Sequence, residues 1–204
     1  MSSDFNKDAL LRSAKRINVS YFKEQQEDAI NAIWQWWQSQ SISFTLSGYA
    51  GTGKTFIMRH LVRYLIVTAP THKALRVLEN SSGKKGMTIQ SLCGLRPDVD
   101  IEDYNIENPS FKVIGEQKMR GYRLVIIDEC SMINPGLFNL LIKTAIQCRC
   151  KLLFLGDELQ IPYVVAKGKG EEDTYNRISP SFTHTDVQFR LTQIVRQEAG
   201  NPLL

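Results

Sequence analysis

The stretch that decides the fold reads Gly48-Tyr49-Ala50-Gly51-Thr52-Gly53-Lys54-Thr55, and it fits the pattern G-x-x-x-x-G-K-[ST]. A short, partly β-branched segment at 42–47 precedes it, and residues 54–64 follow with a helical pattern. Glycines at such a junction let backbone N–H groups turn inward around phosphate oxygens, and the helix N-terminus adds partial positive charge. The stretch therefore predicts a loop that binds phosphate, in which Gly48, Gly51, Thr52 and Gly53 surround the phosphate oxygens. A merely tight turn would not require the Lys-Thr pair.

Outward from this loop, further segments are apolar throughout and have the length of buried strands, at 65–69, 124–127 and 152–155. Helical patterns at 72–79 and 137–146 alternate with them, and residues 188–191 predict a last strand. Fully apolar strands that alternate with helices indicate a parallel sheet covered on both faces. The expected fold class is therefore α/β with a parallel central sheet.

Residues 22–38 predict an amphipathic helix beside this sheet. Ile30, Ile33, Trp34 and Trp37 recur at the spacing of one buried helix face. Trp34 and Trp37 are therefore expected in the core rather than as a stacking platform for bases. Trp36 lies off this stripe, so it is the one tryptophan of the three that we do not expect in the core.

The composition is that of one globular domain: 204 residues, 43% of them apolar and 23% charged. A chain of this length buries about 70% of its unfolded surface, so its core needs neither a disulfide nor a metal. The cysteines contain no C-x-x-C pair and have no histidine at zinc-ligand spacing, which predicts buried thiols in a reducing compartment. No signal-peptide run and no bilayer-spanning segment is present, so we expect a cytoplasmic protein without a membrane partner. The net charge of +4 permits a polyanionic partner without establishing one.

Two adjacent acids follow the buried strand at 124–127, and they complement the phosphate-binding loop. In a site that binds ATP, Lys54 would pair with the β- and γ-phosphates, and the Thr55 hydroxyl would be a ligand of Mg²⁺. Asp128 would hold the same Mg²⁺, while Glu129 would orient or deprotonate the attacking water. Carboxylates at this edge of a sheet lie where α/β proteins bind ligands, so the pair predicts nucleotide hydrolysis.

The strand at 152–155 is followed by Gly156-Asp157-Glu158-Leu159-Gln160, again at the carboxyl edge. Gln160 is neutral and can both donate and accept a hydrogen bond. We expect it to contact the γ-phosphate or the attacking water and so to sense hydrolysis.

The order of these motifs resembles that of superfamily 1 helicases, in the RecD-like B branch that contains the Dda-type helicases. The resemblance rests on residues 48–55, 69–74, 88–92, 128–132, 156–160 and 191–197. It implies a RecA-like P-loop NTPase domain that is the first lobe of an ATP-driven motor. Such a motor walks 5′ to 3′ on single-stranded DNA and unwinds duplex at single/double-strand junctions. The resemblance also implies a second RecA-like domain as partner, whose motifs are missing from this sequence. If the protein is phage-encoded, its expected location is the cytoplasm of a bacterial host.

The resemblance assigns further roles residue by residue. Gln26 takes the place that reads the adenine edge, with Gln25 as the alternative if the register is off by one. Arg196 matches the arginine that reaches the γ-phosphate from the seam between the two lobes. The residues that match positions contacting the DNA backbone are Thr71, His72 and Thr88. Thr71 and His72 can equally cap the helix that follows Pro70.

The segment at 95–118 matches the inserted hairpin that these helicases use as a separating pin. An aromatic residue at its tip would stack on the last base pair, and Phe111 and Tyr104 are the candidates. The domain organisation expected is a RecA-like domain in two parts, 1–94 and 119–204, with the pin at 95–118 between them.

Two other functions stay open on the sequence. One is a nucleotide-switched module that binds single-stranded DNA without unwinding anything. The other is a different P-loop ATPase, such as a packaging or loader protein, whose turnover would not depend on single-stranded DNA.

Overall fold

The computed structural model describes residues 24–61, 66–69, 75–76, 79–80, 85–97, 111–113, 118–160 and 178–194. The helices are α2 (Glu24–Gln38), α3 (Lys54–Leu61), α5 (Ile89–Leu92) and α6 (Pro135–Cys148). Short 3₁₀ turns are η2 (Lys118–Gly121), η3 (Cys130–Met132) and η4 (Pro180–Phe182). The strands are β1 (Ser43–Gly48), β2 (Ile66–Ala69), β3 (Met87–Thr88), β4 (Leu95–Pro97), β5 (Phe111–Val113), β6 (Leu124–Ile127), β7 (Lys151–Gly156) and β8 (Val187–Leu191). Of the helix expected at 72–79, the described residues 75–76 and 79 are helical.

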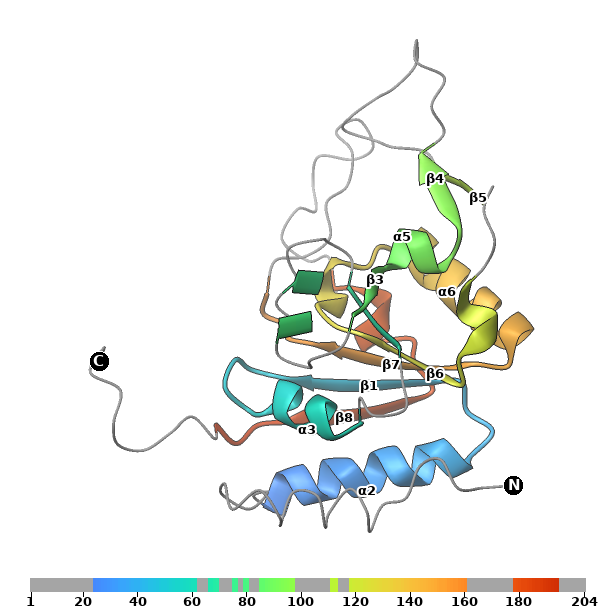
Figure 1. Ribbon diagram of the computed structural model, residues 1–204. Coiled ribbons are helices and arrows are strands. Elements are labelled where there is room, and N and C mark those ends of the chain that lie inside the picture. The colour runs from blue at the N-terminus through green and yellow to red at the C-terminus, as the bar shows by residue number, and fades with distance from the viewer. Residues whose placement is uncertain are drawn as a thin grey trace.

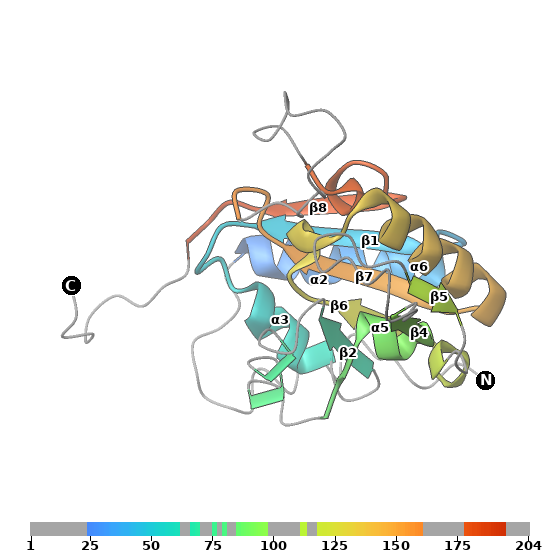
Figure 2. The ribbon, with the colours of Figure 1, turned by 90° about the horizontal axis from the view of Figure 1, so that it is seen from above.

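Among the described residues, the main sheet has six strands in the order β3-β2-β6-β7-β1-β8, and each of their pairings is parallel (Figures 1 and 2). The register places Ser47 opposite Gly156, and Ile127 opposite Phe154. The carboxyl ends of β1, β6, β7 and β8 therefore share one edge of the sheet. The predicted α/β class with a parallel central sheet is confirmed.

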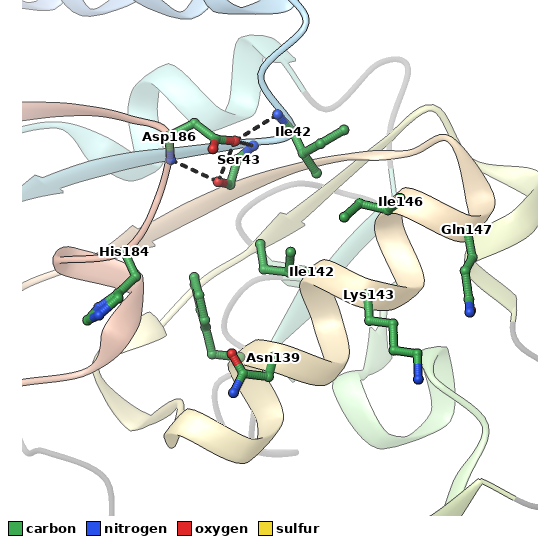
Figure 3. A pocket seen from close by; sticks show the side chains of 10 residues that line it. Ile42, Ser43, Asn139, Ile142, Lys143, Ile146, Gln147, His184 and Asp186 are labelled. Atoms are coloured by element: carbon green, nitrogen blue, oxygen red, sulfur yellow. Dashed lines mark hydrogen bonds between the residues drawn. The ribbon is translucent and has the colours of Figure 1, made fainter.

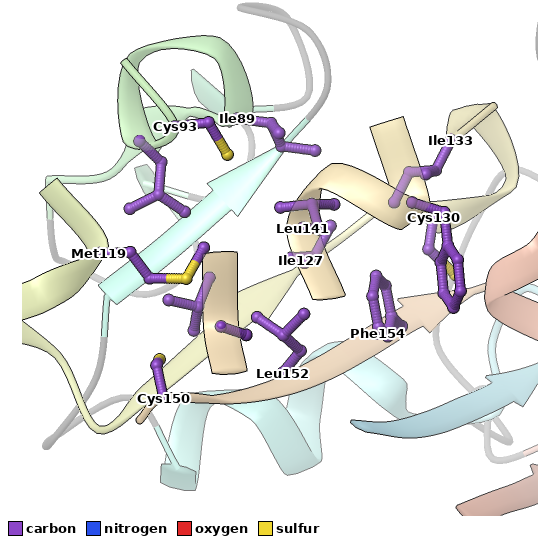
Figure 4. Packing of buried hydrophobic residues seen from close by; sticks show 14 of the residues in the cluster. Ile89, Cys93, Met119, Ile127, Cys130, Ile133, Leu141, Cys150, Leu152 and Phe154 are labelled. Atoms are coloured by element: carbon purple, nitrogen blue, oxygen red, sulfur yellow. The ribbon is translucent and has the colours of Figure 1, made fainter. Parts of the chain in front are cut away.

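Each face of the sheet is covered by its own apolar cluster, because alternate residues of a strand point to opposite faces. Leu124 and Ile126 join the cluster beneath α2 and α3. Val125 and Ile127 join the other cluster, which packs under α5, α6 and η4 (Figure 4). Strands that are buried on both faces account for their unbroken apolar sequences.

The expectation for Trp36 is wrong, because it is the fully buried tryptophan of α2, whereas Trp34 and Trp37 pack against the core as expected but are only partly buried. The Trp36 side chain is 2% exposed and its ring lies 5.4 Å from the ring of Phe44 on β1. Trp34 and Trp37 are only partly buried at the margin of the same cluster. The buried face of α2 begins at Gln26 and continues through Ala29 and Ile33, which brings Trp36 toward the sheet.

A lysine from β7 closes the C-terminal end of α2, which has no basic residue in its own last turn. The Lys151 ammonium donates hydrogen bonds to the carbonyl oxygens of Trp36 at 3.0 Å, Ser39 at 2.9 Å and Ser41 at 2.6 Å. It also lies 5.0 Å from the centroid of the Trp36 ring. Burial lowers the pKa of Lys151, and the carboxylate of Asp186 opposes that shift. The charge therefore binds one carbonyl of the last turn of α2 and two carbonyls of the chain that follows it, where a cation is favourable.

Replacing Lys151 with methionine, which keeps the apolar stem, is expected to lower the free energy of unfolding by about 2 kcal/mol, as for hydrogen bonds to a charged group. Denaturant unfolding of the variant and the parent measures the difference. Lys143→Met on the exposed face of α6 is the matched control and should leave stability unchanged. Equal losses in the two variants would show that Lys151 does not cap α2.

The described cysteines are free thiols, and Cys93, Cys130 and Cys150 are buried. Burial raises the pKa of Cys93 and of Cys150 to about 12, and it also raises the pKa of Cys130. A thiol that stays protonated is a poor nucleophile and a poor metal ligand. These three cysteines are therefore packing residues, as predicted.

A second, two-stranded sheet is formed by β4 and β5, which pair antiparallel with Leu95 opposite Val113 (Figure 1). Residues 95–97 and 111–113 thus pair within the segment 95–118, and the use of this segment as a pin stays a prediction. Across the part of the chain that the structure describes, no helix has the length and apolar character needed to cross a bilayer.

Candidate functional site

The predicted phosphate-binding loop, Asp128 and Glu129 lie at the carboxyl edge of the main sheet. The phosphate-binding loop leaves β1, Asp128 leaves β6, and Asp157 leaves β7, which lies between these two strands. Burial lowers the pKa of Lys54, and the carboxylates of Asp157, Asp128 and Glu129 oppose that shift. The ammonium of the loop and the acids of the neighbouring strands are therefore within electrostatic reach of one another.

The loop is shaped by glycine where it turns into α3. Gly53 has a φ of +92°, and a Cβ there would lie 2.0 Å from the Nε2 atom of Gln26. The Gln26 side chain is buried, and its amide donates a hydrogen bond to the carbonyl oxygen of Thr52 at 3.3 Å. Thr52 is buried as well, and its hydroxyl donates to the carbonyl oxygen of Tyr49 at 2.8 Å. Helix α2 thus supports the loop from below through Gln26.

The Lys54 side chain lies over the start of its own loop. Its ammonium donates hydrogen bonds to the carbonyl oxygens of Gly48 and of Tyr49, the second at 3.0 Å. Thr55 follows it in the first turn of α3, with an exposed side chain. An ammonium and a hydroxyl at a helix N-terminus are the groups that bind a phosphate and its cation.

Asp128 and Glu129 occupy different backbone environments although they are adjacent. The N–H of Asp128 bonds the carbonyl of Thr68 at 3.0 Å, and its carboxylate accepts the N–H of Glu129 at 3.0 Å. Burial raises the pKa of Asp128 to about 6, while the bond from Glu129 and the Lys54 charge oppose the rise. Below about pH 6 the Asp128 carboxyl is largely protonated, so a divalent cation would bind there in competition with a proton.

Asp157 is a site residue that the sequence analysis did not single out. It is 6% exposed, and among the carboxylates near Lys54 it opposes the lowering of the Lys54 pKa most strongly. Its carboxylate accepts the N–H of Leu159 at 3.1 Å, and its carbonyl accepts the N–H of Gln160 at 3.1 Å. Gln160 itself is exposed on the turn that Asp157 organises. The sequence feature that could have identified Asp157 is its position directly after a buried strand, which it shares with Asp128.

Gln25, the alternative reader of adenine, contacts the end of β8 instead. Its side-chain carbonyl accepts the N–H groups of Thr192 and of Gln193, both at 2.8 Å. Its amide donates to the Thr192 hydroxyl at 2.9 Å. Gln25 thus bonds the chain just after β8, whereas Gln26 lies against the phosphate-binding loop, and the reading of adenine by Gln26 stays a prediction.

The residues predicted to contact DNA are only partly described. Thr88 ends the edge strand β3 and is the N-cap of α5, where its hydroxyl accepts the N–H of Ser91 at 3.3 Å. Phe111 begins β5, but its side chain lies outside the described residues. The candidates that lie wholly outside them are Thr71, His72, Tyr104 and Arg196.

A cavity of about 540 Å³ lies away from this edge, between α6 and the amino ends of β1 and β8 (Figure 3). Ile142 and Ile146 of α6 face it, together with Ile42 and Asp186. The Asp186 carboxylate accepts the N–H groups of Ile42 and Ser43, both at 2.8 Å, and the Ser43 hydroxyl at 2.9 Å. The acid therefore anchors the start of β1, and the cavity is not the nucleotide site.

Comparison with known proteins finds a matching family model, relatives of similar sequence and solved structures of similar fold. A family model for the AAA domain matches residues 22–202. ATP-dependent DNA helicase dda of Enterobacteria phage T4 is 35% identical, over 86% of this chain and 40% of its own length. ATP-dependent DNA helicase Pif1 of Psychrobacter sp. (strain PRwf-1) is 25% identical, over 76% of this chain and 25% of its own. The crystal structure of Bacteroides sp Pif1 in complex with ADP-AlF4 superposes with a TM-score of 0.60 at 25% identity, over 88% of this chain and 44% of that one. This chain thus spans less than half the length of these relatives.

Proposed function

We propose, because this chain belongs to the AAA domain family, that it is the first motor lobe of an ATP-dependent DNA helicase. The RecA-like fold and the resemblance to Dda-type helicases, both predicted from the sequence, are confirmed by the relatives. The activity of the whole protein is the proposal: hydrolysis of ATP drives movement on single-stranded DNA and unwinding of duplex.

One observation carries the proposal. The Lys54 ammonium, on the loop after β1, lies within electrostatic reach of carboxylates that follow β6 and β7. A bound triphosphate with its cation would lie between such charges, because the phosphates attract the ammonium and the cation attracts the acids. A tight structural turn requires no such arrangement.

The chain's own residues divide the work at this edge. Lys54 and the loop N–H groups bind the phosphates, and Gln26 supports the loop next to the base. Glu129 takes the proton of the attacking water, Gln160 senses the γ-phosphate, and Arg196 stabilises charge in the transition state.

The donors present suit Mg²⁺, which prefers oxygen ligands. The carboxylate of the half-buried Asp128 and the hydroxyl of Thr55 would hold it. When bound, the cation neutralises developing charge on the phosphates.

The DNA partner and the second lobe are proposed from the relatives and the motifs. Thr71, His72 and Thr88 would grip the phosphate backbone, and Phe111 of the hairpin at 95–118 would separate strands at a single/double-strand junction. The second RecA-like domain would close on the carboxyl edge of the sheet, which exposes Leu159 and Ile194. The resemblance to the RecD-like B branch implies movement from 5′ to 3′. By analogy with the phage T4 relative, the protein would act in the cytoplasm of a bacterial host.

The test is the rate of ATP hydrolysis with and without single-stranded DNA, on this chain and on the longest open reading frame that contains it. We expect single-stranded DNA to stimulate the longer protein strongly, with little preference for sequence and with affinity that falls steeply as salt rises. A rate of ATP hydrolysis that does not change when single-stranded DNA is added would contradict the proposed motor and would indicate another kind of P-loop ATPase. DNA binding and hydrolysis without unwinding would indicate a nucleotide-switched binding module.

A further inference from the structure

Glu129 has a backbone conformation that needs outside support. Its φ of 55° and ψ of 42° lie in the left-handed region, which costs a residue other than glycine about 1–2 kcal/mol. Such conformations persist where the surrounding structure determines them, and they concentrate at functional sites. The contacts on both sides of Glu129 therefore determine where its carboxylate points.

The chain before Glu129 is fixed to the sheet through Asp128, as described above. The chain after it turns at η3, and two serines from the distant η4 segment hold this turn. The Ser181 hydroxyl donates to the carbonyl of Cys130 at 3.0 Å, and the Ser179 hydroxyl donates to the carbonyl of Ile133 at 2.7 Å. Both serines are at most 1% exposed, and their hydroxyls lie 2.9 Å apart. Water therefore cannot replace either bond.

The packing around Cys130 leaves this turn little freedom to move. A Cβ on Gly156 of β7 would lie 2.6 Å from the Cys130 sulfur and 3.0 Å from the ring of Phe182. Cys130, Ile133 and Phe154 lie together at the edge of the cluster shown in Figure 4. The turn is thus packed against β7 and hydrogen-bonded by η4.

The same η4 segment is also bound to β1, the strand that leads into the phosphate-binding loop. The hydroxyl of Thr45 on β1 donates to the carbonyl of Ser181. That hydroxyl also lies 3.0 Å from the Thr185 hydroxyl, which in turn donates to the carbonyl of Ser181 at 3.3 Å. Ser181 therefore connects the loop strand with the turn that carries Glu129.

We propose that Ser181 and Ser179 are positioning residues that hold Glu129 toward the nucleotide bound by the loop. The proposal rests on the proposed function, since it assigns Glu129 to the attacking water. Neither serine touches the reacting atoms; each acts through the turn at η3. Loss of the Ser181 hydroxyl leaves the Cys130 carbonyl with the bond from the N–H of Ile133, which lies within the turn itself, and removes the bond that ties the turn to η4. Without its ties to η4 the turn loses outside support, so the left-handed Glu129 can relax away from its place.

The test compares Ser181→Ala with Thr185→Val in the intact protein, with single-stranded DNA present. Both variants remove a buried hydroxyl that contacts the same segment, but Thr185 makes no bond to the η3 turn. For Ser181→Ala we expect kcat to fall at least about tenfold with KM for ATP unchanged, because a displaced group loses only transition-state stabilisation. Thr185→Val should keep kcat within about twofold of the parent, as its effect is on stability alone.

A double variant separates positioning from general damage. In a Glu129→Gln background, Ser181→Ala should cause no further loss of turnover, because the group that it positions no longer acts. If Ser181→Ala does not fold, Ser179→Ala tests the second bond to the turn in the same way.

The possible outcomes distinguish the two proposals. A parent protein that does not hydrolyse ATP overturns the proposed function. A parent that hydrolyses ATP, with equal losses in Ser181→Ala and Thr185→Val or with additive losses in the double variant, overturns the positioning role alone.

Discussion

Replacing Lys54 with alanine is expected to weaken the binding of Mg-ATP by about 100-fold, which corresponds to the loss of strong hydrogen bonds from a charged donor. The reason is electrostatic: this ammonium is the cation of the loop, and the acids around it would otherwise repel the phosphates. Titration with a fluorescent ATP analogue measures the change, and it applies to this chain as well as to a longer protein.

The control for this variant is Lys143→Ala on the exposed face of α6, far from the carboxyl edge. It removes one positive charge without touching the loop, so nucleotide affinity should stay at the parent value. Unchanged affinity in Lys54→Ala, with an unchanged melting temperature, would mean that the glycine-rich loop is a structural turn.

Replacing Glu129 with glutamine is expected to leave nucleotide binding intact and to lower hydrolysis by about 10²- to 10⁴-fold, the contribution typical of a general base. Glutamine keeps the size of the side chain and its place after Asp128, but it cannot accept the proton of the attacking water. Release of phosphate in a single turnover, measured beside ATP affinity in the same preparation, separates the two effects.

Glu158→Gln is the matched control, because Glu158 lies on the same edge but is partly exposed, 3.4 Å from Arg190 in an ion pair. We expect it to hydrolyse ATP like the parent. A Glu129→Gln variant that still turned over at the parent rate would remove Glu129 from the chemistry and would direct attention to Asp157.

The sequence was sufficient for the parts of the site that depend on short-range order. A strand, a glycine-rich loop and a helix are contiguous at residues 43–61, and Asp128 directly follows a strand that is apolar throughout. Because parallel strands end at one edge, the meeting of Lys54 with Asp128 could be predicted without knowing the order of the strands.

The features that the sequence did not reveal depend on contacts between distant segments. The helical spacing of α2 is compatible with more than one buried face, and the ring of Phe44 and the cation of Lys151 select the one with Trp36. The hydrogen bonds from Gln25 to residues 192 and 193 join positions that are far apart in the chain, and no local pattern marks them.

The hydrogen bonds that hold the turn after Glu129 also join segments that are distant in the chain. Ser179 and Ser181 look like ordinary loop residues, because a serine before or after a proline is typical of a turn. Only the fold places their hydroxyls against the carbonyls of Cys130 and Ile133.

Helix α2 is fixed at both of its ends, which limits how the lobe can respond to its nucleotide. With 15 residues it is about 22 Å long, so it runs the length of the neighbouring strands. Its first turn is bonded to the phosphate-binding loop and to β8, and its last turn to the amino end of β7. A helix clamped in this way cannot slide along the sheet as a piston. If the chain acts as proposed, a change on nucleotide binding would therefore arise at the carboxyl edge of the sheet and not from a shift of α2.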